Sequence, residues 1–122
     1  MLRRKRLIIV GAGGYGREVL GIALAIPAAS RDWEIGGFLD DSPDAAAHLE
    51  SHRIEVPLLG QSRDYPPQAG DVLVCAIADP PSKLRVAEEL MRRGASFVNL
   101  IHPNSEIYRN ARMGVGNIFG NS

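Results

Sequence analysis

The sequence has little cysteine, few aromatic residues and no excess charge of either sign. Its one cysteine, Cys75, excludes a disulfide within a single chain, and its place in the apolar segment VLVCAI predicts a buried thiol. This usage is typical of a reducing compartment, so we expect a cytoplasmic protein. Fourteen basic residues balance fourteen acidic ones, and aromatic residues make up 6% of the chain, which argues against a nucleic-acid partner.

Long hydrophobic runs are also missing. Basic residues at 3–6 are followed by LIIV, an apolar run that ends at Gly11. Because a secretory signal needs about 7–15 apolar residues and a membrane span about 20, we expect neither a signal peptide nor a membrane partner. A metal site is not predicted either, since His48 and His52 have no third ligand beside them in the sequence.

The chain does contain enough apolar material for one folded core, with 122 residues of which 45% are hydrophobic. Short β-branched segments alternate with helical patterns as far as residue 101, which predicts an α/β fold with a parallel sheet and helices on both faces. We expect strands within 7–10, 33–41, 56–60, 71–77 and 96–101. We expect helices within 15–26 and 79–93, and a short one in the connection 42–53.

Apolar residues recur at helical spacing in both longer helices. Those expected to face the core are Val19, Leu20, Ala23, Leu24 and Ile26 in the first helix, and Leu84, Ala87, Leu90 and Met91 in the second. We expect Asp79 or Ser82 to cap the second helix and Gly94 to follow its last turn.

The segment GAGGYG joins the first strand to the first helix. We expect Gly11 to permit a tight turn, Gly13 to leave room for a phosphate, and Gly16 to let the helix pack close to the sheet. The N–H groups near Gly14 and Tyr15 would then face the anion with the positive end of the helix dipole. A GxGxxG pattern in this context predicts a small Rossmann-like sheet, of about five strands, that binds a phosphate compound.

Acidic residues follow two of the expected strands. Asp40 and Asp41 end the second strand, about 24 residues after the glycine loop, and Asp79 follows the fourth. An acid at this edge of a parallel sheet can accept hydrogen bonds from ribose hydroxyls or from the N–H of a base. We favour Asp40 as the residue that faces the ligand. Asp41 can equally open the turn DDSPD, and Asp79 can equally cap the next helix.

The pattern changes after Ile101. Apolar residues then stand six apart, at Ile107, Met113 and Phe119, as in the hexapeptide repeats of a parallel β-helix. About two and a half repeats are present, whereas one coil of the left-handed kind needs three, so we expect an incomplete first coil over 102–122. The alternative is a disordered tail whose periodicity is coincidental.

Several segments together point to one family: LIIVGAGGYGREVL, GGFLDD, ADPPSKLR, FVNLIHP and the hexapeptide onset. They resemble the N-terminal half of bacterial nucleotide-sugar acetyltransferases, of the sialic-acid O-acetyltransferase (NeuD) and bacillosamine-pathway N-acetyltransferase (PglD) types. The resemblance runs from about Arg6 to the last residue. It implies that residues 1–101 form a Rossmann-like domain that binds a UDP-sugar or another activated sugar. It also implies that 102–122 begin a left-handed β-helix, which in the family binds acetyl-CoA and forms homotrimers.

Carried over by position, the resemblance places the substrate at the glycine loop and the acidic strand ends. The candidate substrate-binding residues are Gly11, Gly13, Gly14, Tyr15, Asp40, Asp41, Ala78 and Asp79. Two of them depart from the family, which often has histidine in place of Tyr15 and glycine in place of Ala78, and both departures leave the sugar open. The family's catalytic histidine lies within the β-helix, so no catalytic residue is assigned, His102 included. We expect the 122-residue chain alone to be inactive.

Two other functions compete with this interpretation. Asp40 would also suit the ribose of NAD in an oxidoreductase, although a full dinucleotide-binding fold has six strands and a catalytic region after them. A regulatory nucleotide-binding module that acts alone is the third possibility. A comparison of UDP-sugar and NADH binding discriminates between the first two.

Overall fold

The computed structural model describes residues 4–98, 100–101 and 118–119. Its main element is a sheet of four parallel strands in the order β3-β2-β1-β4. These strands are β1 (Lys5–Val10), β2 (Trp33–Leu39), β3 (Leu58–Gly60) and β4 (Asp71–Cys75). The chain starts in the middle of the sheet, moves outward to β3 and then crosses back to β4, as in the first half of a Rossmann fold. The predicted fold class is therefore confirmed for this part.

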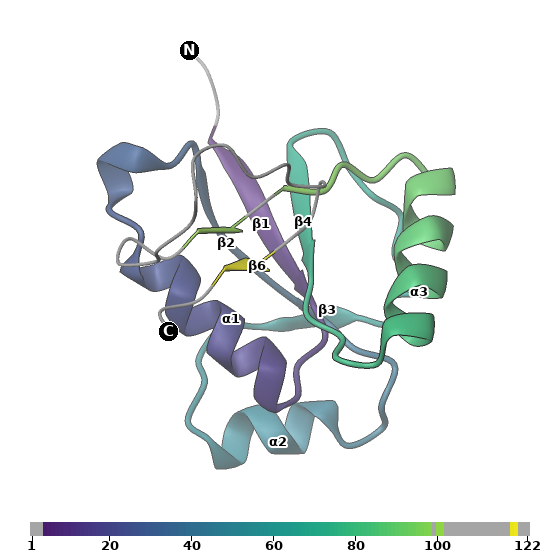
Figure 1. Ribbon diagram of the computed structural model, residues 1–122. Helices are drawn as coiled ribbons and strands as arrows, with labels where there is room; N and C mark the ends of the chain where they lie inside the picture. Colours follow the sequence, from purple (N-terminus) through teal and green to yellow (C-terminus); the bar gives the residue numbers. More distant parts are fainter. Residues whose placement is uncertain (1–3, 99, 102–117, 120–122) are drawn as a thin grey trace.

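The helices cover both faces of the sheet, as expected from the alternation in the sequence. They are α1 (Gly14–Ala25), α2 (Ala45–Ser51) and α3 (Pro80–Arg92), with a 3₁₀ turn at Ala28–Ser30. Figure 1 shows α1 to the left of the sheet, α3 to its right and α2 below. The loops that follow β1, β2 and β4 consequently meet at the lower edge, where the strands have their carboxyl ends.

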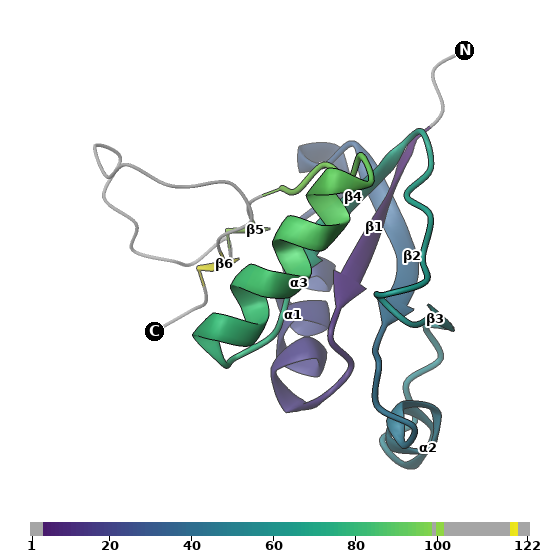
Figure 2. The ribbon, with the colours of Figure 1, turned by 90° about the vertical axis from the view of Figure 1, so that its right-hand side faces the viewer.

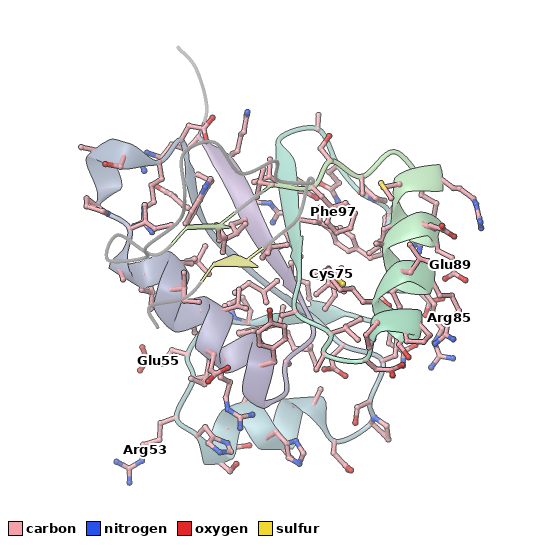
Figure 3. The ribbon with its side chains drawn as sticks, in the orientation of Figure 1. Arg53, Glu55, Cys75, Arg85, Glu89 and Phe97 are labelled. Carbon is pink, nitrogen blue, oxygen red and sulfur yellow. The ribbon has the colours of Figure 1, made fainter. Side chains whose placement is uncertain are left out.

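Strand β1 explains why the core has two halves. Successive side chains of a strand point to opposite faces. Leu7 and Ile9 belong to a cluster that α1 and α2 complete, whereas Ile8 and Val10 belong to a cluster beneath α3. All four are at most 1% exposed, which is why this strand reads as a continuous apolar run. Cys75 lies between β4 and α3 (Figure 3), and its thiol is buried as predicted.

Of the fifth strand expected over 96–101, the described residues place only a single bridge at the β4 edge of the sheet, which has four full strands. Phe97 forms a single parallel bridge with Leu73 of β4. The bridge uses both backbone groups of Leu73, whose N–H donates to Ser96 and whose carbonyl accepts from Val98. The chain then leaves β4, and Leu100 packs into the cluster on the α1 face instead.

Three apolar residues expected in the core lie on the surface instead. Leu24, Leu84 and Met91 are 59%, 60% and 50% exposed. In α3 the residue buried completely is Leu90, with Val86 beside it one turn earlier. Because successive helical residues are about 100° apart, Met91 points well away from the stripe that Val86 and Leu90 form.

A second, two-stranded sheet pairs β5 (Leu100–Ile101) with β6 (Ile118–Phe119) in parallel. Figure 2 shows this pair beyond α1, away from the larger sheet. Leu100 pairs with Ile118, 18 residues later in the chain, which equals three six-residue repeats. This interval matches the six-residue spacing of the apolar residues at 107, 113 and 119. The β-helix predicted for 102–122 otherwise lies outside the described residues and stays a prediction.

Candidate functional site

The glycine loop has the conformation that its sequence predicts. Gly11 has a φ of +111°, and a Cβ there would lie 2.7 Å from the carbonyl oxygen of Ala76. A Cβ on Gly16 would overlap the carbonyl oxygen of Gly11, so α1 can start this close to β1 only with glycine at both positions. Nothing lies within 4 Å of the place where a Cβ of Gly13 would stand. Backbone atoms therefore crowd the loop at Gly11 and Gly16, whereas the space beside Gly13 is open.

The open side of the loop presents backbone donors. Gly13 is the N-cap of α1 and gives no side-chain hydrogen bond to the helix. Within the described part of the chain, the N–H groups of Gly14 and Tyr15 donate to no acceptor. The first turn of α1 contains no acidic residue, so no carboxylate of its own occupies the positive end of the helix dipole. The arrangement fits an anion.

Asp40 braces this loop from the end of β2. One carboxylate oxygen accepts from the N–H of Ala12 at 2.7 Å, and the other accepts from the N–H of Ser42 at 2.7 Å. Each oxygen keeps further acceptor capacity toward a ligand. In this structure Asp40 therefore links the glycine loop to the end of β2. Contact between Asp40 and a ligand stays a prediction.

Asp41 is also engaged within the chain. Its two oxygens accept from the N–H and the hydroxyl of Ser62, each at 2.7 Å. Ser62 is 4% exposed, so this pair is held at the edge of the folded core. Sequence reasoning missed Ser62, because a serine in the segment QSRDYPPQAG carries no signal that it reaches an acid 21 residues earlier.

Asp79 takes the capping role that the sequence left open. Its carboxylate accepts from both the N–H and the hydroxyl of Ser82, at 3.1 and 2.5 Å. These hydrogen bonds from Ser82 hold the pKa of Asp79 below its ordinary value. Gly94 follows α3 with a φ of +96°, which confirms the predicted end of that helix.

Two hollows open beside the loop at the carboxyl edge of the sheet. The first, of about 340 Å³, is lined by Tyr15, Ile77, Ala78, Pro80 and Lys83. The second, of about 200 Å³, is lined by Val10, Gly11, Leu39, Asp40, Asp41, Ser62, Ile77, Ser82, Arg85 and Val86. Ile77 borders both. The predicted site residues Tyr15, Ala78, Asp40 and Asp41 are thus brought to one edge, although they line two adjacent spaces.

One cationic side chain borders each hollow. Lys83 borders the larger one and Arg85 the smaller one. Arg17 folds back over the loop, where its guanidinium donates to the carbonyl of Ala12 at 3.4 Å. Sequence reasoning missed all three, yet a helical start with two cations two residues apart, SKLR, carried the signal for the first two.

Tyr15 contributes a neutral phenol to the larger hollow. Partial burial, reinforced by the nearby Glu18, raises the pKa of Tyr15 above its ordinary value. The hydroxyl stays protonated at neutral pH and can both donate and accept a hydrogen bond. No cluster of three His, Cys, Asp or Glu that could hold a metal occurs among the described residues. Nor does that part of the chain contain a helix long and apolar enough to cross a membrane.

A family model described as the PglD N-terminal domain matches residues 6–90. The chain belongs to this family. No curated protein sequence matches it. Two solved structures of the acetyltransferase domain of PglB from Neisseria gonorrhoeae FA1090 share the fold, each with a TM-score of 0.71 over 94% of this chain. Sequence identity is 24% to the complex with acetyl coenzyme A and 23% to the other structure. The chain spans 52% and 53% of their lengths, about half.

Proposed function

We propose that the chain is the substrate-binding domain of a sugar acetyltransferase, and that it binds a UDP-sugar or a related nucleotide-sugar at the glycine loop. The observation that carries this proposal is the pair of free N–H groups at Gly14 and Tyr15, open above Gly13 and flanked by Lys83. Backbone donors at a helix start, with a cation nearby, are the groups that recognise a diphosphate.

The two hollows suit the two ends of such a ligand. A diphosphate on the loop leaves one end beside Asp40 and Asp41, where carboxylates can accept from a nucleoside. The other end enters the larger hollow, where the Tyr15 hydroxyl and the Lys83 ammonium offer hydrogen bonds to a sugar. Membership of the PglD N-terminal domain family supports this assignment over NAD, for which Asp40 would otherwise be equally suited.

We propose further that the whole protein transfers an acetyl group from acetyl-CoA and assembles as a trimer through a β-helix. The similar Neisseria acetyltransferase domain binds acetyl coenzyme A, and the 18-residue interval between the paired strands β5 and β6 suits a triangular coil. The residues that line the two hollows include no histidine, so we assign acetyl-CoA and the catalytic base to another part of the protein.

Calorimetry with a ligand panel tests the binding proposal. UDP-N-acetylglucosamine, UDP, UMP and NADH are titrated into the chain, and thermal unfolding is recorded with each. A ligand at one hundred times its Kd stabilises the folded state by about 2.7 kcal/mol. We expect UDP and the UDP-sugar to bind and UMP to bind more weakly, because it lacks one phosphate. Tighter binding of NADH than of every uridine compound would reject the proposal and favour the oxidoreductase.

A further inference from the structure

Residues 61–70 form a segment between β3 and β4 that we call the strap. It has no regular strand or helix, yet Ser62 and Tyr65 within it are only 4% and 8% exposed. Tyr65 packs into the cluster between the sheet and α3. A loop with buried polar side chains must satisfy their hydrogen bonds inside the protein, and the strap does so at both ends.

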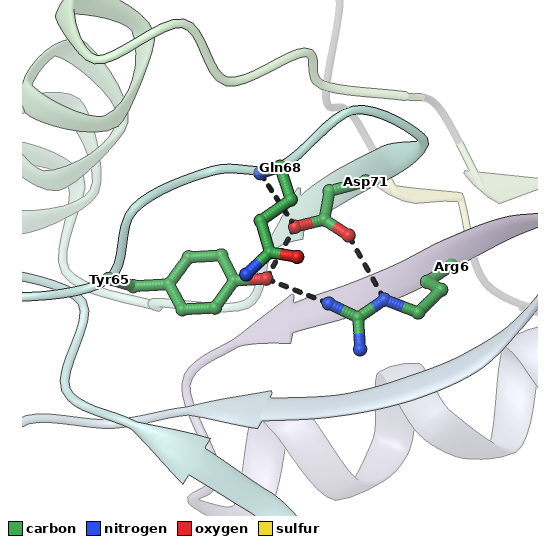
Figure 4. Close-up of polar contacts among 4 residues, drawn as sticks. All are labelled: Arg6, Tyr65, Gln68 and Asp71. Atoms are coloured by element: carbon green, nitrogen blue, oxygen red, sulfur yellow. Dashed lines mark hydrogen bonds and ion pairs between the residues drawn. The ribbon is translucent and has the colours of Figure 1, made fainter.

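One end of the strap is fixed at the amino edge of the sheet. The hydroxyl of Tyr65 donates to Asp71, and the guanidinium of Arg6 donates to Asp71 at 3.1 Å and to Tyr65 at 3.0 Å (Figure 4). The N–H of Gln68 adds a third donor to Asp71 at 3.0 Å. This cluster lies on the first residues of β1 and β4, far along the strands from the glycine loop.

The other end of the strap is held by Arg93, directly after α3. Its guanidinium donates to the carbonyl of Tyr65 and to that of Ser62, both at 2.7 Å. Hydrogen bonds from a charged donor are among the stronger ones in proteins. Ser62 is therefore fixed by two partners. Its carbonyl accepts from Arg93, and its N–H and hydroxyl donate to Asp41.

We propose that Arg93 is a positioning residue for the nucleotide site, acting through Ser62 on Asp41. Arg93 does not line either hollow, whereas Ser62 and Asp41 both line the smaller one. With both donors of Ser62 held in place, the Asp41 carboxylate keeps one orientation and its remaining lone pairs face the hollow. Removal of the guanidinium releases the backbone carbonyls of Ser62 and Tyr65, and Asp41 then loses that orientation. This inference rests on the proposed nucleotide-sugar site.

The test compares Arg93→Gln with Arg92→Gln. Arg92→Gln offers a matched control because it changes the adjacent residue and removes the same charge. Among the described residues, Arg92 forms an ion pair with the exposed Glu88 alone, at 3.8 Å. We expect Arg93→Gln to weaken UDP-sugar binding about tenfold while Arg92→Gln leaves it unchanged. Arg93→Lys, which can reach one of the two carbonyls, is expected to restore part of the affinity.

Two further readouts separate positioning from a general loss of stability. In a double-mutant cycle with Asp41→Asn, we expect the effects of the two substitutions on affinity to be strongly non-additive, because Arg93 acts through Asp41. Additive effects, or unchanged affinity in a folded Arg93→Gln, would overturn the inference. Arg93→Lys carries the same cycle should Arg93→Gln fail to fold.

Hydrogen exchange at the Ser62 N–H makes the test independent of the ligand. We expect this amide to exchange at least about ten times faster in Arg93→Gln than in Arg92→Gln. If the wild-type chain bound no nucleotide-sugar, the proposed function would fail, and exchange alone would decide whether Arg93 controls the contact between Ser62 and Asp41. Equal exchange in both variants would show that it does not.

Discussion

Substitution of Gly13 by valine tests the role of the glycine loop most directly. The backbone of Gly13 has φ −77° and ψ −163°, which any L-residue adopts, and nothing lies within 4 Å of an added Cβ. Valine is a poorer N-cap than glycine, so we expect a loss of up to about 1 kcal/mol of folding stability. The fold should therefore survive, with its circular dichroism spectrum unchanged.

Binding, by contrast, is expected to suffer, because the branched side chain occupies the space above the N–H groups of Gly14 and Tyr15. A hydrogen bond to a charged group contributes about 1.5–3 kcal/mol. Loss of one such bond raises the Kd for a UDP-sugar about 10- to 150-fold. Calorimetry on the folded variant measures this directly. Affinity within twofold of wild type would refute the assignment of the diphosphate to this loop.

Gly16→Ala is the matched contrast, one helical turn away. Its Cβ would overlap the carbonyl oxygen of Gly11, so α1 must move away from β1. We expect a loss of at least about 3 kcal/mol in folding stability, measured by urea unfolding, as for a severely overpacked core. The two glycines of this motif thus have different expected roles: Gly13 leaves room for a ligand, and Gly16 allows α1 to pack close to β1.

Four other changes have expected outcomes. Asp40→Ala removes the acceptor of two backbone N–H groups, at Ala12 and Ser42, and should lower the free energy of unfolding, measured in urea, by about 1–3 kcal/mol. Unchanged stability would show that these two hydrogen bonds do not stabilise the fold. Lys83→Gln should weaken UDP-sugar binding more at 20 mM than at 500 mM salt, because salt screens a charge that borders an open hollow. An equal loss at both salt concentrations would argue against a charge contact. Gly21→Ala, where an added Cβ meets nothing, should stabilise α1 by about 0.5–1 kcal/mol in thermal unfolding, and destabilisation would contradict the exposed position. Burial and the hydrogen bond with Asp71 raise the pKa of Tyr65 to about 12, so the unfolded chain loses this proton at a lower pH than the folded one, and the free energy of unfolding should fall between pH 10 and 12. Tyr65→Phe should make this decline with pH smaller, and the same decline in the variant would refute the argument.

The sequence alone was sufficient for the elements whose cause is local. The apolar run of β1, the glycines at 11 and 16, and the end of α3 before Gly94 each follow from one segment and its backbone requirements. Parallel topology also followed, because strands that alternate with helices need crossovers. The segments that resemble nucleotide-sugar acetyltransferases indicated the family as well, and the match to the PglD N-terminal domain confirms it.

Tertiary structure decided what depends on residues far apart in the chain. Asp40 and Asp41 look like ligands in the sequence, and only the fold shows that they first accept hydrogen bonds from Ala12 and Ser62. Leu84 and Leu90 both look like core residues of α3, but the crossing of that helix over the sheet buries Leu90 and leaves Leu84 exposed. Arg93 donates hydrogen bonds to Tyr65 and Ser62, which are 28 and 31 positions earlier in the chain, and no local sequence pattern predicts such contacts. The reason is physical: helix periodicity and turn conformation are fixed by neighbours in the sequence, whereas hydrogen-bond partners are fixed by the arrangement of whole elements in space.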